Sequence, residues 1–374
     1  MNPHDRNPPL PYHSPVRMRR EFQLAVQCCR WAFDPGGSAP AEDASADLDW
    51  SFFAHLLRRH RVQALVWDCL KTLQIPLPQS TSDAIAADAT EILARNLRTA
   101  RECSQLLESF IDAGVPLMFL KGLSLGALVY RNPFLKAGWD IDLLVPQNCV
   151  IAAVDLLRAA GYRLIFPPAT DADKRLVDWH RRRKESVWHK SDGDFHVELH
   201  SRITDNPRLI PSIGMGSPTQ RVTIAPGSVL PTLRLEPLFA YLCVHGATSA
   251  WFRLKWICDF AALLHGRSIV EIERLYEDSQ RLGAGRSAAQ ALLLANSLFA
   301  TIRDTPLEAR LGDSRANRWL ASAALRQLAG PAAGAEPTER RLGTAMIHLT
   351  QLFLLPGASF KIAELCRQAR DILR

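Results

Sequence analysis

The sequence predicts an α+β fold in which one small mixed sheet, flanked by helices, lies between an N-terminal helical segment and a C-terminal helical domain. Helical periodicity fills most of the first 114 residues and nearly all of the chain after residue 231. Between residues 115 and 205, short apolar runs alternate with helical segments. Such alternation is typical of a small α/β or α+β domain.

The composition is that of an ordinary globular protein. The chain has 374 residues, of which 47% are hydrophobic and 22% are charged. No apolar run approaches the ~18 residues of a membrane span, and the N-terminus lacks the apolar core of a secretory signal. The eight cysteines form no CxxC pair, which is typical of reduced, buried thiols. We therefore expect a cytoplasmic protein without a membrane span.

The formal net charge of +7 is mildly informative. A basic surface suits a polyanionic partner such as a nucleotide, RNA or an acidic lipid. A scatter of solvated arginines explains the same charge equally well.

The N-terminal part divides into a polar leader and a helical region. Residues 1–18 are rich in Pro and polar residues and are predicted to be disordered. Residues 19–114 are predicted to be helical. "REFQLAVQCCRWAF" indicates one helix, "LDWSFFAHLLRRHRVQALVWDCLKTL" two more, and a long helix then runs from "TSDAIAAD" to a glycine near its end.

Residues 115–205 are predicted to form the domain that contains the sheet. In order, "PLMFLKG" indicates a strand, "SLGALVYRN" a helix, "AGWDIDLLVP" a strand, "QNCVIAAVDLLRAAG" a helix, "YRLIF" a strand and "DADKRLVDWHRRR" a helix. "ESVWHK", "SDGD" and "FHVELHS" then indicate a strand, a tight turn and a strand. Residues 206–231, rich in Pro, Gly and Ser, are predicted to be a linker loop, and residues 232–374 a C-terminal helical domain.

Two aspartates interrupt an otherwise apolar strand. In an extended strand, residues two apart point to the same side, so Asp140 and Asp142 share a face while Ile141 and Leu143 occupy the other. Two adjacent carboxylates repel, and their burial is costly without a positive partner. A divalent metal such as Mg²⁺ supplies one. An exposed strand with two solvated aspartates is the plainer interpretation.

A later strand carries further ligand types. In "FHVELH", His196, Glu198 and His200 share one face. Glu198 is placed to complete a triad of carboxylates for two metal ions, which together activate an attacking oxygen and stabilise a leaving one. The three residues are alternatively a zinc-type cluster of a metal-dependent hydrolase, or simply one face of a half-exposed hairpin.

A turn before the aspartates offers a phosphate site. In "FLKGLSLGALV", Lys121 and Gly122 end a strand and Ser124 begins a helix. A strand–turn–helix of small residues exposes backbone N–H groups at a helix N-terminus, where phosphates bind. Lys121 adds a positive charge. The stretch is not a Walker A loop, because GxxxxGK[ST] is absent.

The combined order resembles the nucleotidyltransferase superfamily related to DNA polymerase beta. The order is strand-Lys-Gly-x-Ser-helix, then strand-Asp-x-Asp, then strand-Glu. More narrowly, "FLKG…LVYRNPFLKAGWDIDLLV…HVELH" is similar to a bacterial family of uncharacterised nucleotidyltransferases. It also resembles, more distantly, the AbiEii-type toxin nucleotidyltransferases. The resemblance covers residues 115–265 or so and implies a nucleotidyltransferase sheet.

The resemblance implies roles for these residues. Asp140 and Asp142 would hold two Mg²⁺ ions, or Mn²⁺ in their place, that bridge the phosphates of an NTP. Glu198 would bind the catalytic metal and help activate the acceptor hydroxyl. Gly122 and Ser124 would hold the β- and γ-phosphates through the turn. Lys121 would add charge to this nucleotide-binding site.

The sequence departs from the family pattern at two positions. Leu123 separates the glycine and serine that are usually adjacent, and Lys136 stands where related sequences often carry Arg. Lysine keeps a charge for phosphate but loses the bidentate fork of arginine.

The C-terminal helices add two candidate nucleotide contacts. "EPLFAYLCVHGATSAWFRLKWICDFAALL" resembles the segment that follows the catalytic domain in this family. His245 and Lys255 would then face the triphosphate across a cleft. Alternatively, His245 is a core histidine with satisfied hydrogen bonds, and Lys255 forms a surface ion pair with Asp259, four residues away. Trp251 and Trp256 are expected in the core.

The resulting hypothesis is a magnesium-dependent nucleotidyltransferase. It would move an NMP from an NTP to a hydroxyl or phosphate acceptor and release pyrophosphate. The acceptor is open among small molecules, sugar phosphates, peptides, proteins and tRNA ends. Two alternatives stay open: a non-catalytic nucleotide-binding or interaction module, and the hydrolase built on His196, Glu198 and His200.

Overall fold

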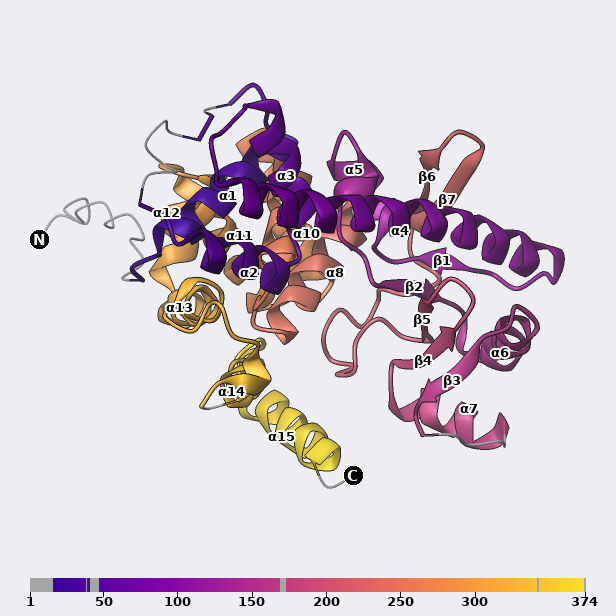
Figure 1. The fold of residues 1–374 in the computed structure, drawn as a ribbon. Helices are drawn as coiled ribbons and strands as arrows, with labels where there is room; N and C mark the ends of the chain where they lie inside the picture. Colours follow the sequence, from indigo (N-terminus) through magenta and orange to yellow (C-terminus); the bar gives the residue numbers. More distant parts are fainter. Residues whose placement is uncertain (1–15, 38, 41–46, 169–172, 342, 373–374) are drawn as a thin grey trace, which may run out of the picture.

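Two bodies, one helical and one built on a sheet, lie side by side along a single long helix, α4 (Gln79–Asp112) (Figure 1). The computed structural model describes residues 16–37, 39–40, 47–168, 173–341 and 343–372. A small mixed sheet flanked by helices confirms the predicted α+β class. The predicted disorder of residues 1–18 concerns residues that lie almost wholly outside the described ranges.

The main sheet of the described residues has five strands in the order β1-β2-β5-β4-β3. They are β1 (Met118–Phe119), β2 (Asp140–Leu144), β3 (Arg163–Phe166), β4 (Glu185–Lys190) and β5 (Phe195–His200). The central β2–β5 pair is parallel, and the other neighbouring pairs are antiparallel. Each of these strands lies within a stretch that the sequence predicts to be extended.

The register of β2 and β5 gives the sheet one apolar and one polar face. Asp140 pairs with His196, and Asp142 with Glu198. Because paired residues on adjacent strands point the same way, the carboxylates of both strands share a face. On the opposite face, apolar side chains such as Leu143 pack against α4 and α6 (Val150–Ala159) in one hydrophobic cluster.

Two short helices and a hairpin complete the sheet body. Helix α5 (Leu123–Val129) follows β1, and α7 (Asp173–Arg182) precedes β4. Strands β6 (Thr219–Ala225) and β7 (Ser228–Leu233) form a separate two-stranded sheet. The prediction of an unstructured linker over residues 206–231 is therefore wrong in its second half. Alternation in "TQRVTIA" buries Val222 and Ile224, a signal that the Pro and Gly content around it obscured.

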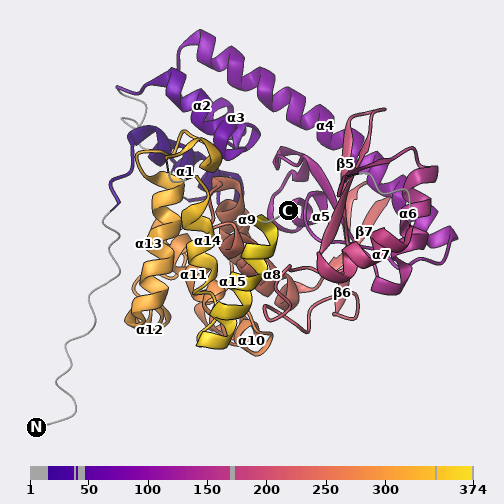
Figure 2. The same cartoon turned by 90° about the horizontal axis from the view of Figure 1, so that it is seen from below.

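Helices from both ends of the chain form the helical body (Figures 1 and 2). They share one hydrophobic cluster that joins Phe22 and Phe53 to Phe239, Phe260 and Phe299. The remaining helices are α1 (Arg20–Phe33), α2 (Trp50–His60), α3 (Gln63–Thr72), α8 (Leu235–Thr248), α9 (Leu254–Leu264), α10 (Ile269–Arg281), α11 (Arg286–Phe299), α12 (Pro306–Asp313), α13 (Arg315–Ala329), α14 (Ala345–Gln351) and α15 (Ala358–Ile372). Among the described residues, none of the helices combines the length and hydrophobicity that a membrane span needs.

Helix α4 ties the two bodies together. With 34 residues at 1.5 Å per residue it is about 51 Å long. It packs on α2 and α3 of the helical body and on α6 and β7 of the sheet body. Its Asn96 side chain, which is buried, donates hydrogen bonds to the carbonyls of Phe134 and Lys136. The segment that leads into β2 is thus fixed by α4.

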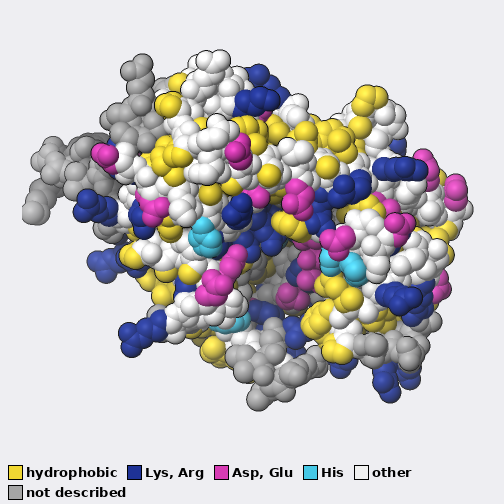
Figure 3. Space-filling view, in the orientation of Figure 1, with side chains coloured by type: hydrophobic (Ala, Val, Ile, Leu, Met, Phe, Trp, Pro, Cys, Tyr) yellow, Lys and Arg dark blue, Asp and Glu magenta, His cyan; other side chains and the backbone are white. Residues whose placement is uncertain are grey.

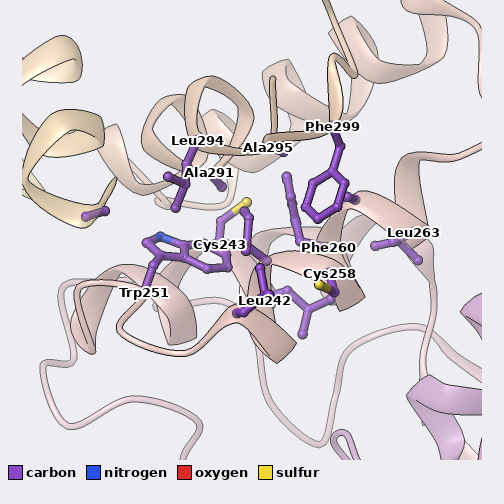
Figure 4. Packing of buried hydrophobic residues seen from close by; sticks show 14 of the residues in the cluster. Leu242, Cys243, Trp251, Cys258, Phe260, Leu263, Ala291, Leu294, Ala295 and Phe299 are labelled. Atoms are coloured by element: carbon purple, nitrogen blue, oxygen red, sulfur yellow. The ribbon is translucent and has the colours of Figure 1, made fainter. Parts of the chain in front are cut away.

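The core of the helical body is tightly packed around Trp251, which is 1% exposed. Figure 4 shows its indole beside Cys243, Phe260 and Leu294. The ring also lies directly over Gly246 of α8, where a Cβ would overlap it. Trp251 is therefore a core residue, as the sequence predicts.

Substituting Gly246→Ala tests this close approach. Because the indole is enclosed, we expect overpacking to lower the free energy of unfolding by about 1–3 kcal/mol. Chemical denaturation measures the loss. Gly312→Ala, on α12, is the control, because its added Cβ meets nothing within 4 Å and should leave stability unchanged or raise it. Equal stability of the two variants would contradict the packing described.

Candidate active site

The three predicted carboxylates converge at the centre of the sheet. Asp140 and Asp142 project from β2, and Glu198 from the neighbouring position on β5. The side chain of Asp142 is 1% exposed, whereas those of Asp140 and Glu198 are 30% and 24% exposed. One buried and two partly exposed carboxylates therefore share the site.

Lys121 supplies the nearest positive charge. Its Nζ lies 2.6 Å from Asp142 Oδ1 and 3.9 Å from Asp140 Oδ2. Burial disfavours this charge, but the two carboxylates outweigh burial and raise the pKa of Lys121 well above its ordinary value. The ammonium group thus occupies the position between the carboxylates where a cation is needed, rather than reaching away toward a phosphate.

His200 supplies a second cation. Its Nε2 lies 3.3 Å from Asp142 Oδ1 and 3.4 Å from Glu198 Oε2, and its Nδ1 lies 3.3 Å from Glu185 Oε2. Burial and the charge of Lys184 lower its pKa, but these three carboxylates prevail and raise the pKa of His200 to about 9. The imidazole is therefore a charged bridge between β2 and β5.

The carboxylates respond differently to their surroundings. Burial, reinforced by Asp140, raises the pKa of Asp142 despite Lys121. Burial also acts on Glu198, but His200 and Lys121 outweigh it and hold the pKa of Glu198 well below its usual range. Burial acts likewise on Asp140, and Lys121 overcomes it, so that pKa is lowered. The pKa of the buried Asp142 carboxyl is thus raised, whereas those of Asp140 and Glu198 are lowered.

Lys184 and Glu185 also belong to the site, although neither was predicted from the sequence. Lys184 Nζ forms an ion pair with Glu185, and Glu185 pairs in register with His200 across the β4–β5 hairpin. The tight turn "SDGD" carried the signal, because counting back from it along both strands places residue 185 opposite residue 200. The acidic partner of His200 was therefore within reach of sequence reasoning.

A cavity of about 210 Å³ lies between the carboxylates and helices α8 and α9. Figure 3 shows the molecule hollowed between the two bodies, with basic and acidic side chains gathered there. Five cations line the cavity, namely Arg61, Lys121, Lys136, Lys184 and Lys255. Every residue predicted for the nucleotidyltransferase site lines it except Ser124. Arg61 comes from the end of α2 and had no sequence signal.

Lys136 and Lys255 are both buried on the helical side of the cavity. Lys136 Nζ lies 3.3 Å from Asp259 Oδ2, and the hydroxyl of Tyr130 donates to Asp259 Oδ1 over 3.0 Å. Lys255 Nζ donates to the carbonyl of Ala137 over 3.2 Å. A surface ion pair between Lys255 and Asp259 is therefore wrong: both are buried, and Lys136 takes the carboxylate because it reaches across from the sheet body.

Burial has a clear electrostatic effect on Lys255. Because its ammonium group is buried and the charge of Lys136 acts on it, the pKa of Lys255 falls to about 7. A lysine in this state is a cation whose charge is only partly compensated. A bound anion would compensate it.

His245 lies where this cavity adjoins a second one. Its Nε2 is buried without a hydrogen-bond partner, and burial lowers the pKa of His245 well below its usual value. The alternative of a core histidine with satisfied hydrogen bonds is therefore not what the structure has. The ring packs against Tyr241 and Trp256.

The glycine turn after β1 is formed, but its serine points inward. Gly122 has φ +72°, which favours glycine, and precedes the first turn of α5. Ser124 is fully buried, and its hydroxyl donates to the Lys121 carbonyl over 3.0 Å. Of the proposed phosphate turn, Gly122 lines the cavity and Ser124 stabilises the turn behind it.

The structure separates the two histidines of β5. His200 forms a group with Asp142 and Glu198, in which one potential ligand atom of each lies within 4.8 Å of the others. His196 instead forms a group with His189 and Asp194. Arg95 forms an ion pair with Asp194 of this group. The predicted hydrolase cluster of His196, Glu198 and His200 is therefore not assembled. His196 lies four residues from His200 along the strand, which is too far for both rings to reach one metal ion.

Two observations fit a divalent cation among Asp140, Asp142 and Glu198. Oδ2 of Asp142 is buried and has no hydrogen-bond partner, although buried oxygens normally have one. Lys121 already presents a cation to two of these carboxylates, those of Asp140 and Asp142. Carboxylate oxygens are the ligands that Mg²⁺ and Mn²⁺ favour. The donor set thus suits a hard divalent metal.

A parallel strand pair with this carboxylate set, a glycine turn before it and a basic cavity above it define the nucleotidyltransferase class. Comparison with known families agrees. The chain belongs to the family of uncharacterised nucleotidyltransferases, whose profile matches residues 46–300. The match spans the sheet body and much of the helical body, and leaves the more distant AbiEii-type resemblance a prediction. A search of curated proteins finds no match.

Substituting Lys255→Met tests the uncompensated charge. The pKa of Lys255 is about 7 in the folded chain and 10.5 ordinarily. Between pH 7 and pH 10.5 the unfolded chain therefore binds more protons than the folded chain, so the free energy of unfolding rises with pH across this range. At pH 6 we expect the variant to be more stable than the wild type by on the order of a few kcal/mol. The advantage should vanish by pH 10.5 or so.

Urea denaturation across this pH range gives the measurement. Lys71→Met, which removes an exposed lysine of α3, is the matched control and should show no such trend. A variant that is less stable than the wild type at pH 6 would show that Lys255 is compensated.

Proposed function

We propose that the protein is a magnesium-dependent nucleotidyltransferase that moves an NMP from an NTP to an acceptor and releases pyrophosphate. The observation that carries the proposal is the convergence of Asp140, Asp142 and Glu198 on one face of the β2–β5 pair. Beside them lies a cavity lined by five cations. Carboxylates for metal and cations for a triphosphate thus meet in one place.

The cations are arranged for a polyanion. Lys136 and Lys255 lie on one side of the carboxylates, and the low pKa of Lys255 makes it a charge that a phosphate would stabilise. Arg61 can donate two hydrogen bonds from its guanidinium group to phosphate oxygens. Gly122, at the turn before α5, lines the same cavity. A triphosphate is therefore the ligand that the charges favour.

Asp140, Asp142 and Glu198 would hold the metal. When bound, Mg²⁺ or Mn²⁺ would neutralise the phosphate oxygens and acidify the attacking hydroxyl. The acceptor oxygen would bond to the α-phosphorus, and the bond from that phosphorus to the oxygen bridging to the β-phosphate would break. Pyrophosphate leaves with the electron pair, and the acceptor proton passes to Glu198. His200 and Lys121 hold the carboxylates in place throughout.

A non-catalytic binding module is the main alternative. It would need the triphosphate site but not three converging carboxylates whose burial is costly. A metal hydrolase would need metal ligands other than those predicted from the sequence. The ligands available to it are Asp142, Glu198 and His200. The charged state of His200 disfavours this set, because a metal-binding imidazole must be neutral.

The double variant Asp140→Asn, Asp142→Asn tests the proposal. Each NTP, labelled at the α- or γ-phosphate, would be incubated with the protein, Mg²⁺ and a host lysate. We expect transfer of α-label only, and a loss of about 10²–10³-fold or more in the variant, because electrostatic stabilisation of the transferred phosphoryl group is removed. Asp155→Asn, which removes an exposed carboxylate of α6, is the control. Transfer of γ-label would indicate a kinase and overturn the mechanism.

Metal content provides a separate prediction. The carboxylate set of Asp140, Asp142 and Glu198 favours loosely held Mg²⁺ that depends on NTP. We expect the purified protein to contain little metal, EDTA to abolish transfer, and Mg²⁺ or Mn²⁺ to restore it. Elemental analysis and activity after metal replacement are the measurements. Stoichiometric zinc that survives dialysis would instead support the hydrolase.

A further inference from the structure

An arginine-lined groove adjoins the candidate active site through a second cavity. The cavity beside the carboxylates shares Lys184 and His245 with a neighbouring cavity of about 220 Å³. That cavity in turn shares Asp205, Asn206 and Arg367 with a groove of about 310 Å³. The three volumes therefore adjoin in series, from the carboxylates to a groove lined by residues of both bodies.

The groove is strongly basic. Its lining holds seven arginines and one carboxylate, that of Asp205. The arginines come from three separate parts of the chain: the end of α7 and the residues after it, the segment after β5, and α15. They are Arg181, Arg182, Arg183, Arg202, Arg208, Arg367 and Arg370. None of them takes part in the chemistry proposed for the carboxylates.

Local acids compensate only part of this charge. Arg181 pairs with Asp178, and Arg367 pairs with Glu364. Arg208 and Arg370 bond to uncharged groups, the Ser359 hydroxyl and the Cys366 carbonyl. Seven guanidinium groups collected around one hollow are mutually repulsive. An anionic ligand would relieve that repulsion.

Arg202 points most directly to such a ligand. Its Nε and Nη2 atoms are buried and have no hydrogen-bond partner, although buried donors normally have one. Arg202 follows β5 two residues after His200, and Glu198 precedes His200 by two. The strand that carries the catalytic carboxylate therefore leads into the basic groove.

The shape favours a chain of phosphates over a single one. One phosphate is bound bidentately by one or two guanidinium groups, whereas here seven are spread over three elements along a groove. A single-stranded nucleic acid presents repeated phosphodiesters, and its bases can stack on guanidinium planes. Its terminus also carries a free hydroxyl, which is the group that the reaction needs.

We propose that this groove binds the acceptor, and that the acceptor is a single strand of nucleic acid. The phosphodiesters lie on the arginines, and the strand's terminal hydroxyl extends past His245 to the carboxylates. That hydroxyl oxygen bonds to the α-phosphorus of the NTP as pyrophosphate departs, so the strand grows by one nucleotide. The last step rests on the proposed function. Binding in the groove does not.

The test measures binding and transfer with one probe, a twelve-nucleotide oligouridylate with a fluorophore at its 5′ end and a free 3′-hydroxyl. We expect Arg182→Glu, Arg208→Glu, both exposed residues, to weaken binding at least tenfold in fluorescence anisotropy. The slope of log affinity against log salt should fall by about one for each phosphate that the variant no longer neutralises. Arg202→Gln probes the buried guanidinium separately.

Two matched variants make the result specific. Arg315→Glu, Arg326→Glu changes two exposed arginines of α13 that line none of the three cavities, and should bind like the wild type. Asp140→Asn, Asp142→Asn should also bind the strand. The proposal is overturned if the groove variant binds as tightly as the α13 variant, if the wild type fails to bind, or if UMP displaces the strand at equal concentration.

Transfer separates this proposal from the one before it. With α-labelled NTP, the wild type should extend the oligouridylate by one nucleotide, and a strand ending in a 3′-phosphate should bind without extension. Groove-dependent binding without transfer to any acceptor would sink the proposed function and leave the groove as a nucleic-acid site. Transfer to lysate components that is unaffected by the groove variant would sink the groove proposal alone.

Discussion

The repulsion among carboxylates at the centre of the sheet is the constraint that organises this protein. Register places Asp142 beside Glu198 on adjacent strands, and such a set is stable only with cations in contact. Lys121 and His200 provide them from the turn after β1 and the end of β5. Each is held at a position that the sheet's own geometry fixes. The charge balance that permits folding thus keeps three carboxylates together on one face of the sheet.

The second half of the site depends on how the two bodies meet. Lys136 lies in the segment leading into β2, and its partner Asp259 lies on α9 of the helical body. That buried ion pair, with Tyr130 also bonded to Asp259, holds the cavity's helical wall against the sheet. The site therefore requires the whole arrangement, because residues of both bodies line the cavity. The family profile accordingly extends well beyond the sheet.

Much of the fold and site could be predicted from the sequence, and the limits have physical reasons. Alternation in "GWDIDLLVP" and "FHVELH" indicated the strands, the shared face and the α+β class, because a side-chain period of two is a local property. The direction of Ser124 and the partner of Asp259 could not be predicted, since both depend on contacts between distant segments. Arg202 and its neighbours were likewise scattered along the chain. The β6–β7 hairpin was not predicted, because the Pro and Gly content of residues 206–231 indicated a loop more strongly than the short alternation in "TQRVTIA" indicated a strand.

Helix α4 gives the cleft a further property. It is one uninterrupted helix, packed on α2 and α3 at one end and on α6 and β7 at the other. A straight hydrogen-bonded helix without proline or glycine inside it resists bending. Helix α4 therefore holds the two bodies at a fixed separation. The width of the cleft between the two bodies is therefore set by this helix, rather than by a movement that opens and closes the cleft. A ligand that reaches the carboxylates would therefore be selected by its fit to a cleft whose width α4 sets.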